Sequence, residues 1–137
     1  MMKLIDDEIL KIVPKSELNG LDSKGLGWLV RDRWGGVDFS KAGNVHDGHY
    51  YLLSKNIEDF FVLADCYLSR KEEASLWDLR NHLSHKASGI NYSNRVFYKN
   101  LCIINNHESK TVLGKYLRKP ILLAYYLGVK MFGRYFV

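Results

Sequence analysis

An adjacent His-Asp pair followed by a tyrosine is the part of this sequence best suited to chemistry. His46 and Asp47 are neighbours, and Tyr50 follows His46 by four residues. An α-helix turns by about 100° per residue, so neighbouring side chains point in different directions, whereas residues four apart share a face. In a helix, the His46 imidazole can therefore act as a general base while the Asp47 carboxylate binds a hard cation.

A second carboxylate, Asp65, is expected to complete this set. We predict a helix over 56–69, with Asp65 on or beside its apolar face. A carboxylate in that position must be paired or hydrogen-bonded. If this helix packs antiparallel to a helix over 40–54, Asp65 returns to the level of His46. We therefore predict that Asp65 accepts a hydrogen bond from the imidazole and fixes its tautomer, and that Tyr50 donates to the same carboxylate.

Glycines concentrate in the segment 19–36, upstream of the His-Asp pair, which predicts a loop. Calcium takes about six to eight oxygen ligands, and backbone carbonyls of such a loop would add to the carboxylate of Asp47. A cation held there polarises an ester carbonyl and stabilises the oxyanion that forms. With His46 as the base, the arrangement predicts ester hydrolysis by an activated water.

The elements that must position these side chains are mainly helical. The expected helices cover residues 3–13, 40–54, 56–69, 71–84 and 110–132. The run 95–104 is rich in residues that favour strands, which predicts an irregular or β-hairpin excursion at about 85–110. We therefore expect a mainly α, single domain over 1–137, built on two antiparallel helices plus a C-terminal helix.

The last helix is expected to belong to the core. The apolar stretch 121–137 is interrupted by Lys130 and Arg134, whereas a membrane-spanning helix needs about 20 predominantly apolar residues. Pro120 is expected to kink this helix or to start a new one. The core candidates of this helix are Val112, Leu113, Tyr116, Ile121, Leu122, Ala124, Tyr125, Val129 and Phe132.

Composition sets wide limits on class and partners. The chain has 137 residues with 47% hydrophobic and 26% charged side chains, which is typical of a soluble domain. The net charge of +5 favours an anionic partner or serves solubility alone. Cys66 and Cys102 cannot build a disulfide-dense scaffold. The first eight residues contain acids and no long apolar run, so we predict cytoplasmic synthesis without a signal peptide.

Three stretches resemble one known family. The stretch 38–50 reads Asp-Phe-Ser-Lys-Ala-x-x-x-His-Asp-x-x-Tyr, 64–68 reads Ala-Asp-Cys-Tyr-Leu, and the closing segment 124–136 is a long apolar stretch. Together they resemble the bacterial and fungal type of phospholipase A2, in its catalytic helices and its last core helix. The resemblance implies a phospholipase A2-like core and calcium-dependent hydrolysis of a phospholipid ester.

The resemblance also implies roles for individual residues. His46 would be the base, Asp65 the group that orients it, and Asp47 a calcium ligand. The family's calcium loop carries an acid and glycines, so Asp22 is the second expected ligand. Tyr50 would hydrogen-bond the orienting carboxylate. A phospholipid or anionic membrane surface is the implied partner, with basic residues and exposed tryptophans of the segment 28–34 engaging it.

The chain departs from that family just before the His-Asp pair. Gly43, Asn44 and Val45 stand where the family has a bridged cysteine, and the missing disulfide suits an intracellular form. A group of phage tail-associated proteins is similar in its His-Asp-x-x-Tyr element, later acid and closing helix. That resemblance leaves a virion-associated protein or an exported effector as further locations, and a partner protein in an assembly as a further partner.

Other metal chemistries fit the sequence less well. Phosphohydrolases with a His…His-Asp…Asp pattern need a histidine upstream of the pair, and none precedes His46. Zinc prefers imidazole, and the pairs His46/His49 and His82/His85 have the required three-residue spacing, but such histidines are more often solvated. A buried hydrogen-bonded pair that holds helix register is the structural alternative for His46 and Asp65.

The leading hypothesis is therefore calcium-dependent phospholipid hydrolysis. The alternative is a non-catalytic binding or assembly protein that retains a phospholipase A2-like fold and uses its basic surface for a partner. We do not expect a nucleic-acid partner, because the basic residues are scattered along the chain.

Overall fold

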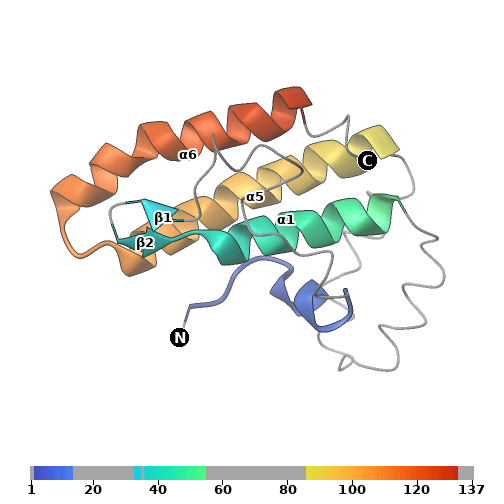
Figure 1. Ribbon diagram of the computed structural model, residues 1–137, viewed down its shortest axis with the longest axis horizontal. Coiled ribbons are helices and arrows are strands. Elements are labelled where there is room, and N and C mark those ends of the chain that lie inside the picture. Colours follow the sequence, from blue (N-terminus) through green and yellow to red (C-terminus); the bar gives the residue numbers. More distant parts are fainter. Residues whose placement is uncertain (1, 14–32, 35, 55–85, 133–137) are drawn as a thin grey trace.

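Three packed helices and a short 3-10 helix make up most of the residues that the computed structural model describes, which are 2–13, 33–34, 36–54 and 86–132 (Figure 1). The helices are α1 (Ser40–Leu53), α5 (Lys86–Glu108) and α6 (Val112–Phe132), and the 3-10 helix is η1 (Asp7–Lys11). The prediction of a mainly α protein is confirmed. The helices predicted at 56–69 and 71–84 lie outside the described residues.

Helix α1 begins where the sequence predicted. The Oδ1 atom of Asp38 accepts a hydrogen bond from the Ser40 backbone N–H at 2.9 Å, so a side chain satisfies one of the N–H groups left free at the helix start. The face that packs inward carries Ala42, Val45 and Leu52 among its buried residues. The helix ends at Leu53, one residue before the predicted end.

A short β-ribbon leads into this helix. Strand β1 (Arg33–Trp34) pairs antiparallel with β2 (Val37–Asp38) in the register Arg33 to Asp38 and Trp34 to Val37. Gly36 lies in the turn at φ 82°, a conformation that glycine adopts without steric cost. The ribbon adds no layer to the packing, but Val37 is buried and ties the start of α1 to the core.

The predicted excursion at about 85–110 is wrong, because α5 is one helix from Lys86 to Glu108. Three residues of this run that favour strands, Val96, Phe97 and Ile104, repeat with Leu101 at helical spacing, and all four are at most 4% exposed. Burial of one continuous apolar face outweighs the local preference of single residues for extended backbone.

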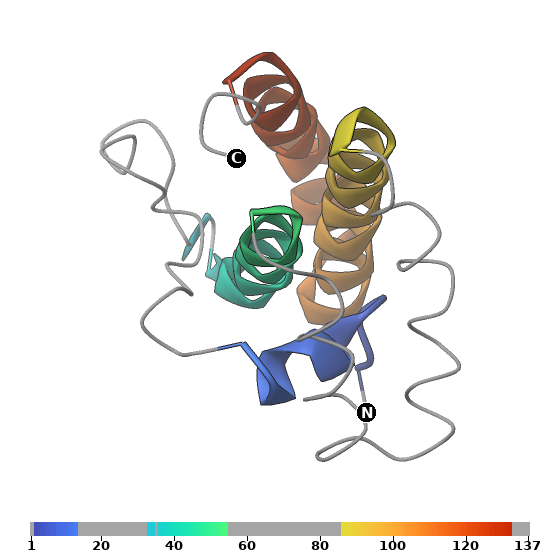
Figure 2. The same cartoon turned by 90° about the vertical axis from the view of Figure 1, so that its right-hand side faces the viewer.

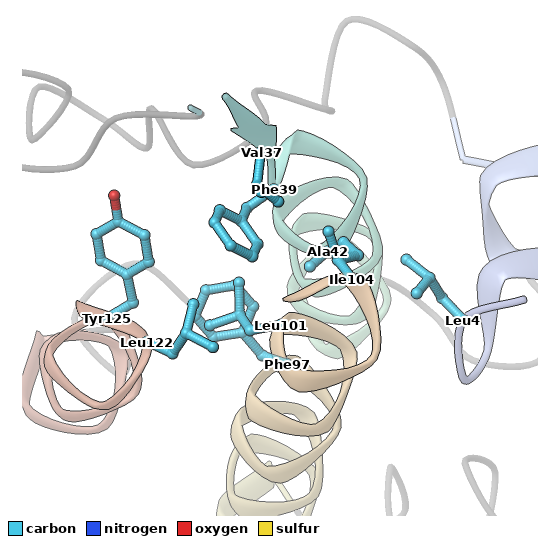
Figure 3. Close-up of a cluster of buried hydrophobic side chains, with 9 residues drawn as sticks. All are labelled: Leu4, Val37, Phe39, Ala42, Phe97, Leu101, Ile104, Leu122 and Tyr125. Atoms are coloured by element: carbon cyan, nitrogen blue, oxygen red, sulfur yellow. The ribbon is translucent and has the colours of Figure 1, made fainter. Parts of the chain in front are cut away.

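Helix α5 lies at the centre of the packing. It runs antiparallel to α1 and to α6 and lies against both, while the N-terminal segment packs across α1 and α5 on the side away from α6 (Figures 1 and 2). The largest core cluster draws on all three helices, on β2 and on the N-terminal segment (Figure 3). Its buried members are Leu4, Val37, Phe39, Ala42, Phe97, Leu101, Ile104, Leu122 and Tyr125.

Helix α6 agrees with the predicted range 110–132 but contributes less to the core than expected. Leu122 and Tyr125 are buried, whereas Val112, Leu113 and Tyr116 are 71%, 69% and 57% exposed. The helix runs through Pro120 rather than restarting there. Among the residues that the structure describes, no helix has the length and hydropathy needed to cross a membrane.

The N-terminal segment, predicted as a helix over 3–13, forms only the single 3-10 turn η1. It is held by α5 through Asn100, whose Oδ1 accepts from the Ile5 N–H at 2.7 Å and whose Nδ2 donates to the Ile5 carbonyl at 3.0 Å. Ile9 packs so closely on α1 that a Cβ at Gly48 would lie 3.2 Å from its Cγ2 atom. Glycine at position 48 therefore permits this approach.

Replacing Leu101 with alanine is expected to lower the free energy of unfolding by about 2–5 kcal/mol, because a fully buried side chain is removed and a cavity remains. Urea denaturation followed by circular dichroism measures the change. Lys99→Ala is the matched control, since Lys99 is exposed on the same helix and its loss is expected to change stability by less than about 0.5 kcal/mol. Equal midpoints for the two variants would contradict the core assigned to α5.

Candidate functional site

His46 lies on α1, on the side that faces α5, and its partner is an amide. The ring is only 6% exposed, and its Nε2 atom lies 2.9 Å from Oδ1 of Asn94 on α5. Asn94 is itself 2% exposed. The contact joins two helices across the interior, so both side chains are held by their helices as well as by each other.

Tyr50 completes this set. It lies one turn after His46 on α1, and its hydroxyl donates to the same Oδ1 of Asn94 at 2.8 Å. A carbonyl oxygen only accepts, so the Nε2 atom of His46 carries the proton and Nδ1 holds the lone pair. Sequence analysis predicted this geometry for His46 and Tyr50, with Asp65 as the acceptor; among the described residues, the acceptor is Asn94.

The surroundings of His46 favour its neutral form. The ring centroid lies 4.2 Å from that of Tyr50 and 4.8 Å from that of Phe97. Burial lowers the pKa of His46 from 6.5 to about 4; the hydrogen bond that the ring donates to Asn94 acts in the opposite direction, and nearby His49 lowers the pKa further. Burial also raises the pKa of Tyr50. Both side chains are therefore uncharged at neutral pH.

A second histidine set, which sequence analysis missed, lies one turn further along α1. His49 is fully buried, and its Nε2 atom lies 3.2 Å from Oδ2 of Asp6. The hydroxyl of Tyr92, on α5, donates to the same oxygen at 2.8 Å. The Nδ1 atom of His49 is buried without a hydrogen-bond partner within the described part of the chain. This set has the composition His, Asp and Tyr that was predicted around His46.

The zinc hypothesis finds no support at the pair His46/His49. The Nε2 atoms of the two rings bind different side chains, Asn94 and Asp6. Across residues 2–13, 33–34, 36–54 and 86–132, no group of three or more metal-ligating side chains of the His, Cys, Asp or Glu type gathers. The second pair, at 82 and 85, lies outside these ranges.

The remaining predicted site residues are only partly covered. Asp47 lies on α1 between the two histidine turns and is half-buried. Asp65 and Asp22 lie outside the described residues, so the approach of Asp65 to His46 stays a prediction. Calcium takes about six to eight oxygen ligands, more than the carboxylate of Asp47 alone supplies. The described residues therefore do not build a calcium site by themselves.

Asn94 belongs to a pattern that can be seen in the sequence. Asparagines recur in the segment 86–108, and their side chains compete with helical hydrogen bonds when they lie on the surface. In the helix, three of them are at most 2% exposed and lie beside the apolar face: Asn94, Asn100 and Asn105. A buried amide must find hydrogen-bond partners, so an asparagine at a buried helical position indicates a contact with a neighbouring element.

The chemistry that this site allows follows from the charge of the partner. The amide holds the Nε2–H and leaves Nδ1 as the basic nitrogen, so His46 can accept a proton there. However, a neutral amide stabilises the resulting imidazolium less than a carboxylate does. The site is a tautomer-fixed imidazole of low basicity, backed by Asn94 and Tyr50.

Comparisons with protein-family models, with curated proteins and with solved structures gave no match to this chain. The resemblance to phospholipase A2 therefore remains a prediction from the motif residues.

Stability is expected to depend on pH through His46. Its folded pKa of about 4 lies below the unfolded value of 6.5, so the unfolded chain binds the proton more readily between these values. The stabilisation is present above pH 6.5 and is lost as the pH falls toward 4, by on the order of 3 kcal/mol. Urea unfolding of wild type and His46→Gln across this range measures it. Parallel curves for the two proteins would contradict the assignment.

Proposed function

We propose that this chain hydrolyses a phospholipid ester by a phospholipase A2-like mechanism in which His46 is the general base. The observation that carries the proposal is the hydrogen-bonded set of His46, Asn94 and Tyr50, which links two antiparallel helices. It has the arrangement that the motif resemblance implies for a catalytic imidazole and a supporting tyrosine, but the acceptor among the described residues is the amide of Asn94, whereas the resemblance implies the carboxylate of Asp65. In this proposal, α1 and α5 are the two core helices of the phospholipase A2-like fold, and α6 is its last helix.

The reaction follows from the protonation state of the ring. The Nδ1 atom of neutral His46 takes a proton from a water molecule as that water adds to the ester carbonyl. Asn94 meanwhile retains the Nε2–H, so the ring becomes an imidazolium without changing orientation. The tetrahedral intermediate then collapses: the bond from the carbonyl carbon to the alcohol oxygen breaks, and the imidazolium returns the proton to that oxygen. The products are a fatty acid and a lysophospholipid.

Calcium is part of the proposal only through the motif resemblance. Asp47, Asp22 and the glycine-rich segment 19–36 would hold it, and its role would be to polarise the ester carbonyl. The base chemistry of His46 is a separate claim, so the two are tested by separate arms of one assay.

A specific observation favours a second candidate, a non-catalytic binding or assembly protein that retains this fold. The partner of His46 is a neutral amide, and the pKa of the imidazole is lowered to about 4, which suits a structural hydrogen bond better than a strong base. In that case His46, Asn94 and Tyr50 hold α1 and α5 in register. This candidate includes the phage tail-associated proteins that the sequence resembles.

Replacing His46 with alanine is expected to lower the rate of fatty-acid release from mixed phospholipid vesicles by about 10²–10⁴-fold, because the general base is lost. The wild type is measured with added calcium and with a chelator. His107→Ala is the matched control, since His107 is exposed near the end of α5. Equal release by wild type and His46→Ala, with both folded by circular dichroism, would exclude His46 as the base.

Replacing Asn94 with aspartate separates the two candidates. A carboxylate beside His46 would raise the pKa of the imidazole above about 4 and stabilise the imidazolium, so we expect the hydrolysis rate to rise on the order of tenfold to a hundredfold. The pKa of His46 is followed by NMR titration of the ring protons. A raised pKa without any gain in hydrolysis would support the non-catalytic candidate instead.

A further inference from the structure

Exposed apolar side chains of this protein gather on one helix. Every large hydrophobic residue that is strongly exposed in the described ranges lies on α6, and their exposed fractions run from 46% to 71%. They are Val112, Leu113, Tyr116, Leu117, Leu123, Leu127 and Met131. At about 100° of turn per residue these positions share one side of the helix, so they form one stripe, here called the outer face of α6.

The orientation of this stripe is set by the opposite side of the helix. Leu122 and Tyr125 are buried in the main core cluster (Figure 3). Arg118 also points inward: its Nε donates to Oδ1 of Asn105 at 3.1 Å, and its Nη2 donates to Oγ of Ser109 at 3.0 Å. These contacts fix the rotation of α6 about its axis, so the apolar outer face is turned away from α5.

A helix that is apolar on both sides is normally covered on both sides. The inner side of α6 is covered by the protein itself. The outer face is long, since the helix has 21 residues, and its large side chains remain exposed. A contiguous apolar surface of this kind marks an interaction site.

The charges along this part of the chain identify the kind of surface that would cover it. From Ser109 to the last residue the sequence contains no aspartate or glutamate, but it contains six lysines and arginines. Lys119 and Lys130 are exposed on α6, and the Nζ atom of Lys119 lies 4.6 Å from the centroid of the Tyr116 ring. A cation therefore sits against an aromatic ring of the outer face.

We propose that the outer face of α6 docks in the plane of an anionic phospholipid membrane. The apolar side chains would enter the boundary between headgroups and acyl chains, while the lysines reach back to the lipid phosphates. A second copy of the chain is a poorer occupant, because it would bring the same uncompensated positive charges together. This inference rests on the proposed function, for which it names the surface that carries the substrate.

Binding is measured by sedimentation of the full chain with vesicles of ether-linked phospholipid, which have no ester to hydrolyse. Neutral phosphatidylcholine vesicles are compared with vesicles that also contain phosphatidylglycerol. We expect binding to the anionic vesicles, with at least about tenfold weaker partitioning for the double variant Leu117→Ser, Leu127→Ser, because buried apolar area is lost. Lys119→Glu is expected to weaken partitioning about tenfold.

Lys3→Glu is the matched charge control, since Lys3 is exposed on the N-terminal segment, which lies across the α1–α5 pair from α6 (Figure 2). It is expected to bind like the wild type. Absent binding, equal binding to neutral vesicles, or equal loss in both charge variants would overturn the proposal. So would a dimer in sedimentation velocity that only the leucine variant dissolves. Binding without hydrolysis of ester lipids would overturn the proposed function alone.

Discussion

Burial of asparagine amides along α5 is the constraint on which the rest of this structure depends. Each of three buried asparagines binds a different neighbour: Asn94 binds side chains of α1, Asn100 the backbone of Ile5, and Asn105 the carbonyl of Lys115 on α6. A buried polar group left without a partner costs about 1–3 kcal/mol. Apolar side chains can still pack after a small shift of one element along another, whereas such a shift would break these hydrogen bonds. The hydrogen bonds therefore fix the register of the elements around α5.

The two buried histidines of α1 differ in the charge of the side chain that each one binds. His49 faces the carboxylate of Asp6, which can compensate a positive charge, whereas His46 faces the amide of Asn94, which cannot. The carboxylate of Asp6, in the N-terminal segment, thus lies beside the fully buried ring of His49. The amide lies beside the ring that the motif marks for proton transfer. An activity of this chain would therefore rely on tautomer control more than on charge stabilisation.

Sequence patterns predicted the helices near 40–54 and 110–132 because apolar residues recur there at helical spacing. The same patterns placed His46 and Tyr50 on one face, which the structure confirms. They failed at 95–104, where strand-favouring residues are buried along a helix. They did not point to Asn94 as a partner of His46, because a search for chemistry looks for charged groups and passes over amides. Which side of α6 stays exposed depends on tertiary packing, which periodicity does not report.

The clamp between Asn100 and Ile5 joins positions that are 95 residues apart. During synthesis Ile5 leaves the ribosome before its partner on α5 exists. At about 5–20 residues per second, the wait is roughly 5–20 s. Until then the apolar side chains of the N-terminal segment, with Ile9 and Leu4 among them, lack the α5 part of the surface on which they are later buried. These residues are thus made well before their packing is complete, and a chaperone that holds them meanwhile would act on this segment.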